Sequence, residues 1–398
     1  MGADFDAIVA GHVCLDVIPQ SIPSTRPPGS ALEPGALHEI GPVVLAAGGA
    51  VANTGLALDR LGLAVRLVGK VGDDPFGAVV RRLLTDRAQT AFDDMLVDPS
   101  SCTSYSIVFS QPGIDRTFWH CPGANDTFQA SDIATPWLDH VRLFHFGYPP
   151  LMRLMYSRGA GELATMLRHV RDRGCTTSLD MALPDPSSEA SGADWAAILE
   201  EALPHTDIFA PSLEEILVML GPSIAAVQPV VGGPPDPRVL RAIGDRILEM
   251  GARVVLIKLG GAGAYVRTAG SSLVANMGRA TPSQPASWAD RELWAPCLDV
   301  DVVGTTGAGD VTVAGFLAGL LRGQDPEAAL ASAVAVGACS VEAADAFSGI
   351  RSWEATQARL ASGWRSSPLA LPPKWERCRR LAVWRGPIDS GWEGPRGA

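Results

Sequence analysis

Short apolar runs alternate with longer stretches of helical periodicity along most of the chain. The apolar runs are rich in β-branched residues and are bounded by polar residues or glycine, which is the pattern of buried strands. We expect these strands at residues 7–11, 65–72, 105–110, 141–147, 176–180, 207–211 and 253–260. We expect helices at residues 50–61, 74–88, 159–173, 193–202 and 236–250. Strands separated by helices predict βαβ units, and therefore an α/β fold with a mostly parallel sheet.

Two segments interrupt this alternation. Residues 19–45 are rich in proline and glycine, and residues 96–120 alternate apolar and polar positions. Together they predict a small antiparallel sheet that projects over the main one. That sheet is either a lid over a binding site or an ordinary irregular edge, and we favour the lid.

The last third of the chain predicts two further irregular regions. Residues 268–298 have the composition of a long loop. The pattern of the preceding chain ends near residue 365, so we expect one domain over 1–365 and a C-terminal extension over 366–398. Three tryptophans in this extension indicate that parts of it dock onto the body or onto a partner. They are Trp375, Trp384 and Trp392.

Composition and charge narrow the classes of partner. The 398 residues are 47% hydrophobic and 19% charged, with a formal net charge of −11. This charge argues against a protein that coats nucleic acid or an anionic membrane. The seven cysteines are scattered, odd in number and without a CxxC pair, as in a reducing compartment. Acidic Asp4 and Asp6 stand where a signal peptide would be basic, so we expect a cytoplasmic protein without a membrane anchor.

The stretch GTTGAGD at 304–310 carries the candidate chemistry. It leads into an almost wholly apolar helix, expected at about 310–322. Small residues let the backbone approach a bulky anion, and the first amides of a helix have no partner inside it. The glycine spacing is that of a Walker A loop, but Asp310 and Val311 stand where Lys and Ser/Thr are needed. Asp310 is then either an N-cap or a base that takes a hydroxyl proton in phosphoryl transfer.

Other chemistries find little support in the sequence. The run GGAGAYV at 260–266 lacks the last glycine of a dinucleotide-binding loop. No GxSxG elbow occurs, which argues against a hydrolase of that type. The seven histidines show no spacing typical of a metal site, so we expect surface or core roles for them.

The run at 304–310 resembles the C-terminal signature of the PfkB (ribokinase-like) family of carbohydrate and nucleoside kinases, matching DTTGAGD at all but its first position. The resemblance implies a three-layer α/β/α fold with a mostly parallel sheet and a small β-sheet lid. It implies that Asp310 is the catalytic base and that the amides of Gly307, Ala308 and Gly309 form an anion hole. It also places Thr306 among the nucleotide-contacting residues.

A second region, residues 46–77, is similar to the N-terminal signature of the same family. The resemblance implies that the Gly48-Gly49 turn lets the hydroxyl groups of a substrate approach the backbone, and that Asn53 bonds to them. It implies that Asp16 accepts a further substrate hydroxyl. The alternative is that Gly48-Gly49 is a plain turn and that Asn53 caps a helix over 54–61.

Three more stretches follow in the family's order. RTFWHCPGAN at 116–125 resembles the returning lid strand, in which Arg116 either reaches the substrate or is simply exposed. PSLEE at 211–215 resembles the Asn-x-x-Glu motif, which implies Glu215 near Mg²⁺ and its waters. LGGAGAYV at 259–266 resembles the turn beside the nucleotide phosphates, which implicates Gly260 and Gly263. Lys258 precedes that turn and contacts phosphate or forms an ion pair.

The chain also departs from the family pattern. Gly304 replaces the acidic residue that in some relatives helps to organise a monovalent-cation site, so potassium activation is not carried over, although Asp301 lies nearby. Ser212 replaces the usual Asn of Asn-x-x-Glu, which alters the expected metal-water network.

The resemblance as a whole implies an ATP- and Mg²⁺-dependent kinase that phosphorylates a hydroxyl of a sugar or sugar derivative. A nucleoside kinase with the same chemistry is one alternative. A sugar- or nucleotide-binding protein with weak turnover is another, motivated by Gly304 and Ser212. Relatives often pair through their lids, so a homodimer is possible.

Overall fold

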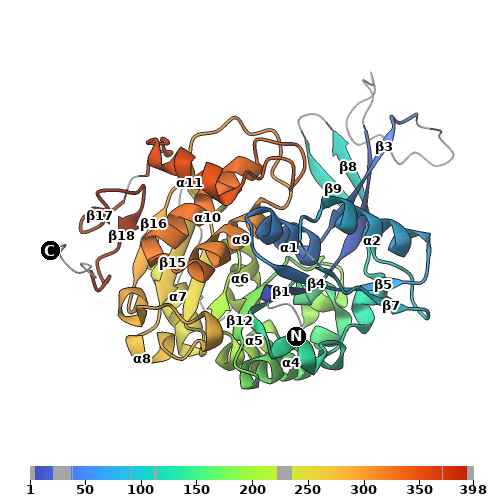
Figure 1. Cartoon of the computed structure of the whole chain (residues 1–398), viewed down its shortest axis with the longest axis horizontal. Coiled ribbons are helices and arrows are strands. Elements are labelled where there is room, and N and C mark those ends of the chain that lie inside the picture. Colours follow the sequence, from blue (N-terminus) through green and yellow to red (C-terminus); the bar gives the residue numbers. More distant parts are fainter. Residues whose placement is uncertain are drawn as a thin grey trace.

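The computed structural model describes residues 5–20, 37, 39–90, 92–111, 114–221, 235–369 and 371–391. Within these residues the chain forms three layers, with helices on both faces of one large twisted sheet and a small sheet at one side (Figure 1). No helix in this part of the chain is long and apolar enough to cross a membrane.

The large sheet has eleven strands in the order β17-β18-β16-β15-β14-β13-β12-β10-β1-β4-β6. From β6 to β14 neighbouring strands are parallel, and from β14 to β17 they are antiparallel. The parallel part consists of β6 (Phe92–Asp93), β4 (Val65–Val68), β1 (Phe5–Gly11), β10 (Val141–Gly147), β12 (Thr176–Asp180), β13 (Ile208–Phe209) and β14 (Val254–Lys258). The antiparallel part consists of β15 (Ala264–Thr268), β16 (Glu292–Ala295), β18 (Trp384–Arg385) and β17 (Glu376–Arg377).

Side chains of the central strands alternate between two apolar cores. In β1, Val9 belongs to one core, and its neighbours Ile8 and Ala10 belong to the other. Because successive strand residues point to opposite faces, a strand buried on both sides has a continuous apolar sequence. This burial explains why the parallel strands could be predicted from short apolar runs.

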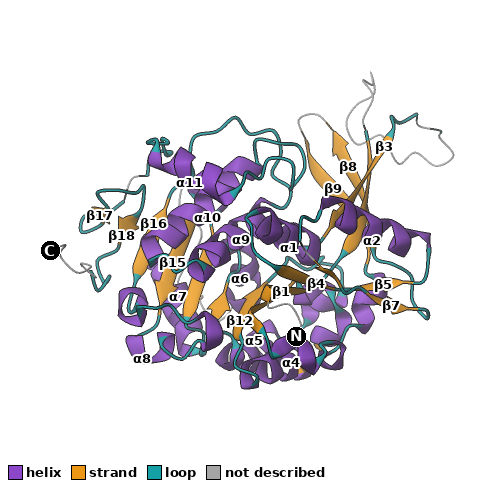
Figure 2. Cartoon of the chain, viewed as in Figure 1, coloured by secondary structure: helices purple, strands orange, loops and turns teal. Residues whose placement is uncertain are grey.

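Two sets of helices cover these faces (Figure 2). One core contains residues of α1 (Ala50–Arg60), α2 (Pro75–Arg87), α9 (Ala308–Leu321) and α10 (Pro326–Ser340), with α11 (Trp353–Ala361) packed on α10. The other contains residues of α4 (Gly161–Asp172), α5 (Trp195–Ala202), α6 (Leu213–Leu220) and α7 (Pro237–Glu249). The short helices α3 (Thr135–Leu138) and α8 (Ser271–Val274) complete the set. Helices α9 and α10 are buried nearly all round, which explains their almost purely apolar sequences.

The small sheet is formed by β3 (Val43–Gly48), β2 (Cys14–Pro19), β8 (Tyr105–Gln111) and β9 (Ile114–Cys121), in that order. It stands at one side of the large sheet (Figure 1). Two of its strands come from the predicted lid segment 96–120, and the first half of β3 comes from segment 19–45. Residues 21–36 and 38 of that segment lie outside the described residues. Strand β2 was not predicted as part of this sheet.

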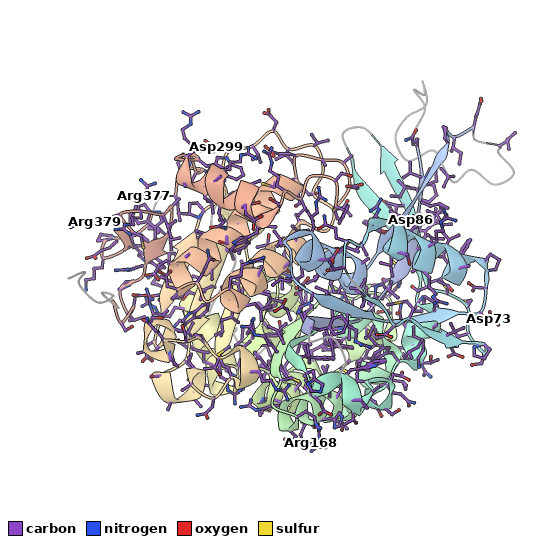
Figure 3. All side chains as sticks on the ribbon, viewed as in Figure 1. Asp73, Asp86, Arg168, Asp299, Arg377 and Arg379 are labelled. Atoms are coloured by element: carbon purple, nitrogen blue, oxygen red, sulfur yellow. The ribbon has the colours of Figure 1, made fainter. Side chains whose placement is uncertain are left out.

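The C-terminal residues extend the large sheet at its antiparallel edge. Strand β18 pairs with β16, and Trp375 is buried with its ring 6.2 Å from that of Trp294. Arg377 and Arg379 lie at the outer margin of this region (Figure 3). The expected docking of Trp375 and Trp384 onto the body is therefore observed, whereas Trp392 lies outside the described residues.

Several predicted boundaries were wrong. The run 65–72 divides into β4 and β5 (Lys70–Gly72), and β5 pairs with β7 (Leu96–Asp98) rather than continuing the large sheet. The predicted loop 268–298 contains α8 and β16, whose buried Glu292 conceals the strand pattern. The predicted helix 159–173 is preceded by β11 (Ser157–Ala160), and the predicted strand 207–211 is reduced to β13.

Candidate active site

A cavity of about 990 Å³ opens at the carboxyl-terminal ends of the parallel strands, beside the small sheet. Ligands of open α/β sheets bind at this edge. The cavity brings together most of the predicted site residues: Asp16, Gly49, Asn53, Ser212, Glu215, Lys258, Gly260, Thr306, Gly307, Gly309 and Asp310. Gly48, Ala308 and Gly263 do not line it, and the side chain of Arg116 lies outside the described residues.

The start of α9 presents the glycine-rich loop to the cavity. The helix begins at Ala308, with Gly307 as N-cap in the left-handed region (φ 67°), so the predicted start at 310 was two residues late. Asp310 lies in the first turn, and the N-cap residue Gly307 has no side chain that could cap the helix. The N-cap interpretation of Asp310 was therefore wrong, and its carboxylate is available for another role.

The loop has donors suited to an anion. The hydroxyl of Thr306 is buried and has no hydrogen-bond partner within the described part of the chain, although it lines the cavity. The amide of Ala308 donates to the carbonyl of Thr305 at 3.3 Å, a long bond that an anion could replace. An orphaned buried donor beside a helix N-terminus fits a phosphate oxygen.

Two neutral donors hold the Asp310 carboxylate. Asn53 Nδ2 donates to Oδ2 at 2.8 Å, and the Tyr148 hydroxyl lies 2.7 Å from both Oδ1 and Oδ2. Burial raises the pKa of Asp310, while Lys258 and these two hydrogen bonds oppose that rise. Asn53 lies within α1, three residues after its start, so the interpretation of Asn53 as an N-cap was also wrong.

A buried ion pair lies next to Asp310. Lys258 Nζ is 2.5 Å from Asp180 Oδ1 and 3.9 Å from Glu215 Oε2. Burial disfavours charge on Lys258, but Asp180 and Glu215 outweigh it and raise the lysine pKa. Burial raises the pKa of Asp180 to about 7 against the opposing effect of Lys258. A Cβ added to Gly309 would lie 3.5 Å from Lys258 Cδ, so the lysine reaches the base of the glycine-rich loop.

Ser212 and Glu215 form a capping box at the start of α6. The amide of Ser212 donates to Glu215 Oε2 at 2.6 Å, and the amide of Glu215 donates to Ser212 Oγ at 3.2 Å. Ser212 thus holds Glu215 at the cavity wall. No group of three or more His, Cys, Asp or Glu side chains able to hold a metal is present in the described residues. Mg²⁺ commonly keeps its waters and binds one or two carboxylates together with substrate phosphates, so Glu215 alone fits such an ion.

Asp16 and its neighbours form the wall of the cavity contributed by the small sheet. A Cβ on Gly48 would lie 2.3 Å from Asp16 Oδ2, so glycine at 48 makes room for this carboxylate rather than only for a ligand. Gly49 has φ 87° and is the N-cap of α1, where a Cβ would meet His12. His12 Nε2 lies 3.3 Å from His120 Nε2, and burial lowers the pKa of both rings.

Backbone crowding explains one departure from the family pattern, at Gly304, and also one glycine that matches the pattern, Gly263. A Cβ on Gly304 would lie 2.8–2.9 Å from the carbonyl oxygens of Ala343 and Ala344, so this backbone has no room for an acidic residue. Gly263 has φ 92°, and a Cβ there would lie 2.0 Å from the Ala295 carbonyl, which gives this glycine a packing role. Gly260 also has a positive φ (53°), but nothing lies near its Cβ position.

The sequence analysis missed four side chains of this region: Tyr148, Asp180, His12 and His120. Tyr148 follows β10, Asp180 ends β12 and His12 follows β1. Since carboxyl ends of parallel strands share one edge, their position after predicted strands was a usable signal. For His120 the signal is absent, because it depends on how the small sheet folds over the large one.

Comparison with known proteins identifies the family to which the chain belongs. Residues 8–352 match the model of the pfkB family of carbohydrate kinases. The chain therefore belongs to that family and is a carbohydrate kinase, a phosphotransferase with an alcohol group as acceptor. A relative described as an uncharacterized sugar kinase of Archaeoglobus fulgidus is 26% identical over 273 residues, covering 68% of this chain and 89% of the relative.

Solved structures show the same fold. Ribokinase of Arabidopsis thaliana, complexed with ribose and ATP, has a TM-score of 0.67 at 17% identity and covers 89% of this chain and 98% of its own. A putative ribokinase II of E. coli, in complex with ATP and Mg²⁺, has a TM-score of 0.62 at 19% identity with coverages of 89% and 98%. The predicted ribokinase-like α/β fold with a large, mostly parallel sheet and a small lid sheet is confirmed.

Proposed function

We propose that this protein transfers the γ-phosphoryl group of ATP to a hydroxyl group of a neutral sugar, with Asp310 as general base. The observation that carries the proposal is the position of the Asp310 carboxylate. It lies in the first turn of α9, in the same cavity as the orphaned Thr306 hydroxyl and the glycine-rich loop. This position supports the proposal, because phosphoryl transfer to a hydroxyl needs a proton acceptor beside the transferring group.

The remaining roles follow from this arrangement. Asp310 accepts the proton of the attacking hydroxyl, and the amides of Gly307, Ala308 and Gly309 stabilise charge on the phosphoryl oxygens. Asp16, Gly48, Gly49 and Asn53 shape the acceptor side, with Arg116 as a further substrate contact. On the nucleotide side, Ser212, Lys258, Gly260, Gly263 and Thr306 hold or support the phosphates. Mg²⁺ bound near Glu215 through water would neutralise phosphate charge.

Charge in the cavity favours a neutral acceptor. Its described lining contains six carboxylates: Asp16, Asp126, Asp185, Glu214, Glu215 and Asp310. Lys258 is the cation among these described lining residues, and it is already paired with Asp180. The two histidines stay neutral near pH 7 because burial lowers the pKa of each ring. A carboxylate or phosphate group on the acceptor would be repelled by these negative charges. Hydroxyl groups of a neutral sugar would instead find hydrogen-bond acceptors and donors in the cavity.

ADP release with a panel of acceptors tests the proposal. We expect turnover with the neutral sugars fructose, glucose or ribose that is at least tenfold more efficient than with the anionic acceptors gluconate and ribose 5-phosphate. A preference for the charged compounds would overturn the neutral-acceptor assignment and would point to Arg116. Adenosine or inosine as the best acceptor would favour a nucleoside kinase. Saturable sugar binding without turnover on the whole panel would favour a binding protein.

The proposal also includes the domain organisation and the oligomeric state. We infer a kinase domain over 1–365, with 19–45 and 96–120 as lid segments that close over the acceptor, and an added segment over 366–398. Large apolar side chains are exposed on the small sheet, among them Val43, Val44, Phe118 and Trp119. Exposed apolar patches commonly mark interfaces, which supports a homodimer formed through the lids. Light scattering on the purified protein distinguishes a dimer from a monomer.

A further inference from the structure

Tyr148 makes the closest contact with the Asp310 carboxylate. Its hydroxyl is 2.7 Å from each carboxylate oxygen, so a single O–H is shared between both. Asn53 donates to Oδ2 alone, at 2.8 Å. A carboxylate has about four acceptor positions. The two donors therefore leave Oδ1 with room for one more hydrogen bond, which an acceptor hydroxyl can fill.

The backbone holds Tyr148 in an unfavourable conformation to make this contact. Its φ of 70° and ψ of 45° lie in the left-handed region, which bulky side chains rarely adopt. The Tyr148 amide donates to the Asp180 carbonyl at 3.2 Å, and the Leu151 amide donates to the Tyr148 carbonyl at 3.0 Å. The ring lies 5.8 Å from that of His12. Strain of this kind persists where the surroundings impose it, and it clusters at functional sites.

Tyr148 remains a donor at physiological pH. Burial raises the pKa of its hydroxyl well above the ordinary value, and the nearby carboxylates of Asp310 and Asp180 raise it further. The phenol therefore keeps its proton and does not itself act as a base. Its ring lies beside that of His12, its backbone is held by hydrogen bonds, and its hydroxyl bonds to both oxygens of Asp310, so these contacts set the direction of the bond to Asp310.

We propose that Tyr148 is a positioning residue for the phosphoryl transfer: its shared O–H fixes the plane of the Asp310 carboxylate and leaves Oδ1 directed at the acceptor hydroxyl. This inference rests on the proposed role of Asp310 as base. A base held by two neutral donors needs no reorientation when the acceptor arrives. The residue follows β10 and lies outside all five of the sequence stretches that resemble the family.

The same bond favours the ionised form of the base and so opposes the rise in its pKa caused by burial. The groups that face Asp310 are Asn53 of α1, Glu215 of α6, Lys258 at the end of β14 and Asp180 at the end of β12, besides Tyr148 itself. Lys258 favours the ionised form, whereas Glu215 and Asp180 disfavour it. Loss of the Tyr148 donor would shift this balance toward the protonated acid, which cannot accept the hydroxyl proton.

The test compares Tyr148→Phe with Tyr105→Phe. Phenylalanine at 148 keeps the ring and its backbone while removing the O–H. Tyr105 is half-buried on β8 against Phe76 and does not line the cavity, so its variant controls for loss of a phenol. We expect Tyr148→Phe to lower kcat about tenfold or more, with little change in the KM for ATP. The acid limb of kcat against pH should move to higher pH, and Tyr105→Phe should match the wild type.

Each outcome bears on one proposal. An unchanged acid limb and kcat in folded Tyr148→Phe would overturn the positioning role and leave Asp310 as base intact. A fall in kcat without movement of the acid limb would assign Tyr148 a packing role and also overturn the inference. Full activity of Asp310→Asn would instead overturn the proposed function. Circular dichroism and ATP binding confirm that each variant is folded.

Discussion

The ammonium of Lys258 lies 2.5 Å from the carboxylate of Asp180, and both side chains are almost entirely removed from solvent. Asp180 Oδ2 has no hydrogen-bond partner within the described residues, so this carboxylate depends on its remaining contacts, to Lys258 and to the Met181 amide. A buried pair of this kind is costly to break, because removal of one charge leaves the other without compensation.

We expect Lys258→Met to lower the free energy of unfolding by about 3–5 kcal/mol. Adding Asp180→Asn should recover a large part of that loss, since Asp180 then carries no charge that lacks its partner. Activity should stay low in both variants, because the cation below the glycine-rich loop is gone. Urea unfolding measures the stabilities, with Lys374→Met at an exposed position as control. A double variant as unstable as the single one would contradict the pairing argument.

Gly48→Ala tests the role of Asp16. The new Cβ would lie 2.3 Å from Asp16 Oδ2 and must displace that carboxylate. We expect the KM for the acceptor to rise about tenfold while the KM for ATP changes little, because Asp16 lies on the acceptor side. Gly192→Ala has open space around its Cβ and serves as the matched control. Equal effects on both KM values would show that the substitution disturbs the whole site instead.

We expect buried His145 to make the free energy of unfolding fall at acidic pH. Burial, aided by Lys258, lowers its pKa to about 3, while the unfolded chain titrates at the ordinary value near 6.5. Because the pKa of His145 is lower in the folded state, neutral His145 contributes fully to the free energy of unfolding above pH 6.5. This contribution is lost as the pH falls from 6.5 toward 3. The slope is about 1.4 kcal/mol per pH unit for this group.

The measurement is urea unfolding at pH 7.5 and pH 5.5. His145→Asn retains a partner for Ser178, which bonds to the histidine Nδ1 at 2.9 Å. This variant should lose less stability than the wild type on acidification. Exposed His140→Asn should behave like the wild type. Identical losses in all three proteins would refute the assignment.

Buried ion pairs attach the C-terminal segment, residues 366–391, to the large sheet and α10. Arg291 is fully buried between Glu327 and Asp389, and Arg385 also contacts Glu327. We expect Asp389→Asn to cost about 2–3 kcal/mol of stability, since the guanidinium loses one charged partner but keeps the other. Urea unfolding measures the free energy of unfolding of Asp389→Asn, with Glu354→Gln at an exposed position as the control. A loss below about 0.5 kcal/mol would show that the segment is only loosely attached.

The parallel strands and their covering helices could be predicted because burial on both faces leaves a long apolar run. The ends of a two-residue strand such as β13 cannot be predicted from the sequence, because two residues show no hydrophobic periodicity. Strand β16 was missed because its buried Glu292 is neutralised by Arg241 from a distant helix. Within the site, the glycine-rich loop and Asp310 could be found because their chemistry is local. Tyr148 and Asp180 could be placed at the same sheet edge from the ends of their predicted strands, but their contacts with Asp310 and Lys258 depend on side-chain packing that the sequence does not specify.

The central claim is that Asp310 takes the proton of the attacking hydroxyl. The most direct measurement is kcat of Asp310→Asn with saturating Mg·ATP and the best acceptor of the panel, together with the Kd for ATP. Asparagine has the same shape but cannot accept that proton, so kcat should fall about 10²–10⁴-fold while the Kd for ATP stays within about twofold. A kcat within tenfold of the wild type, in a folded variant that binds ATP, would contradict the account.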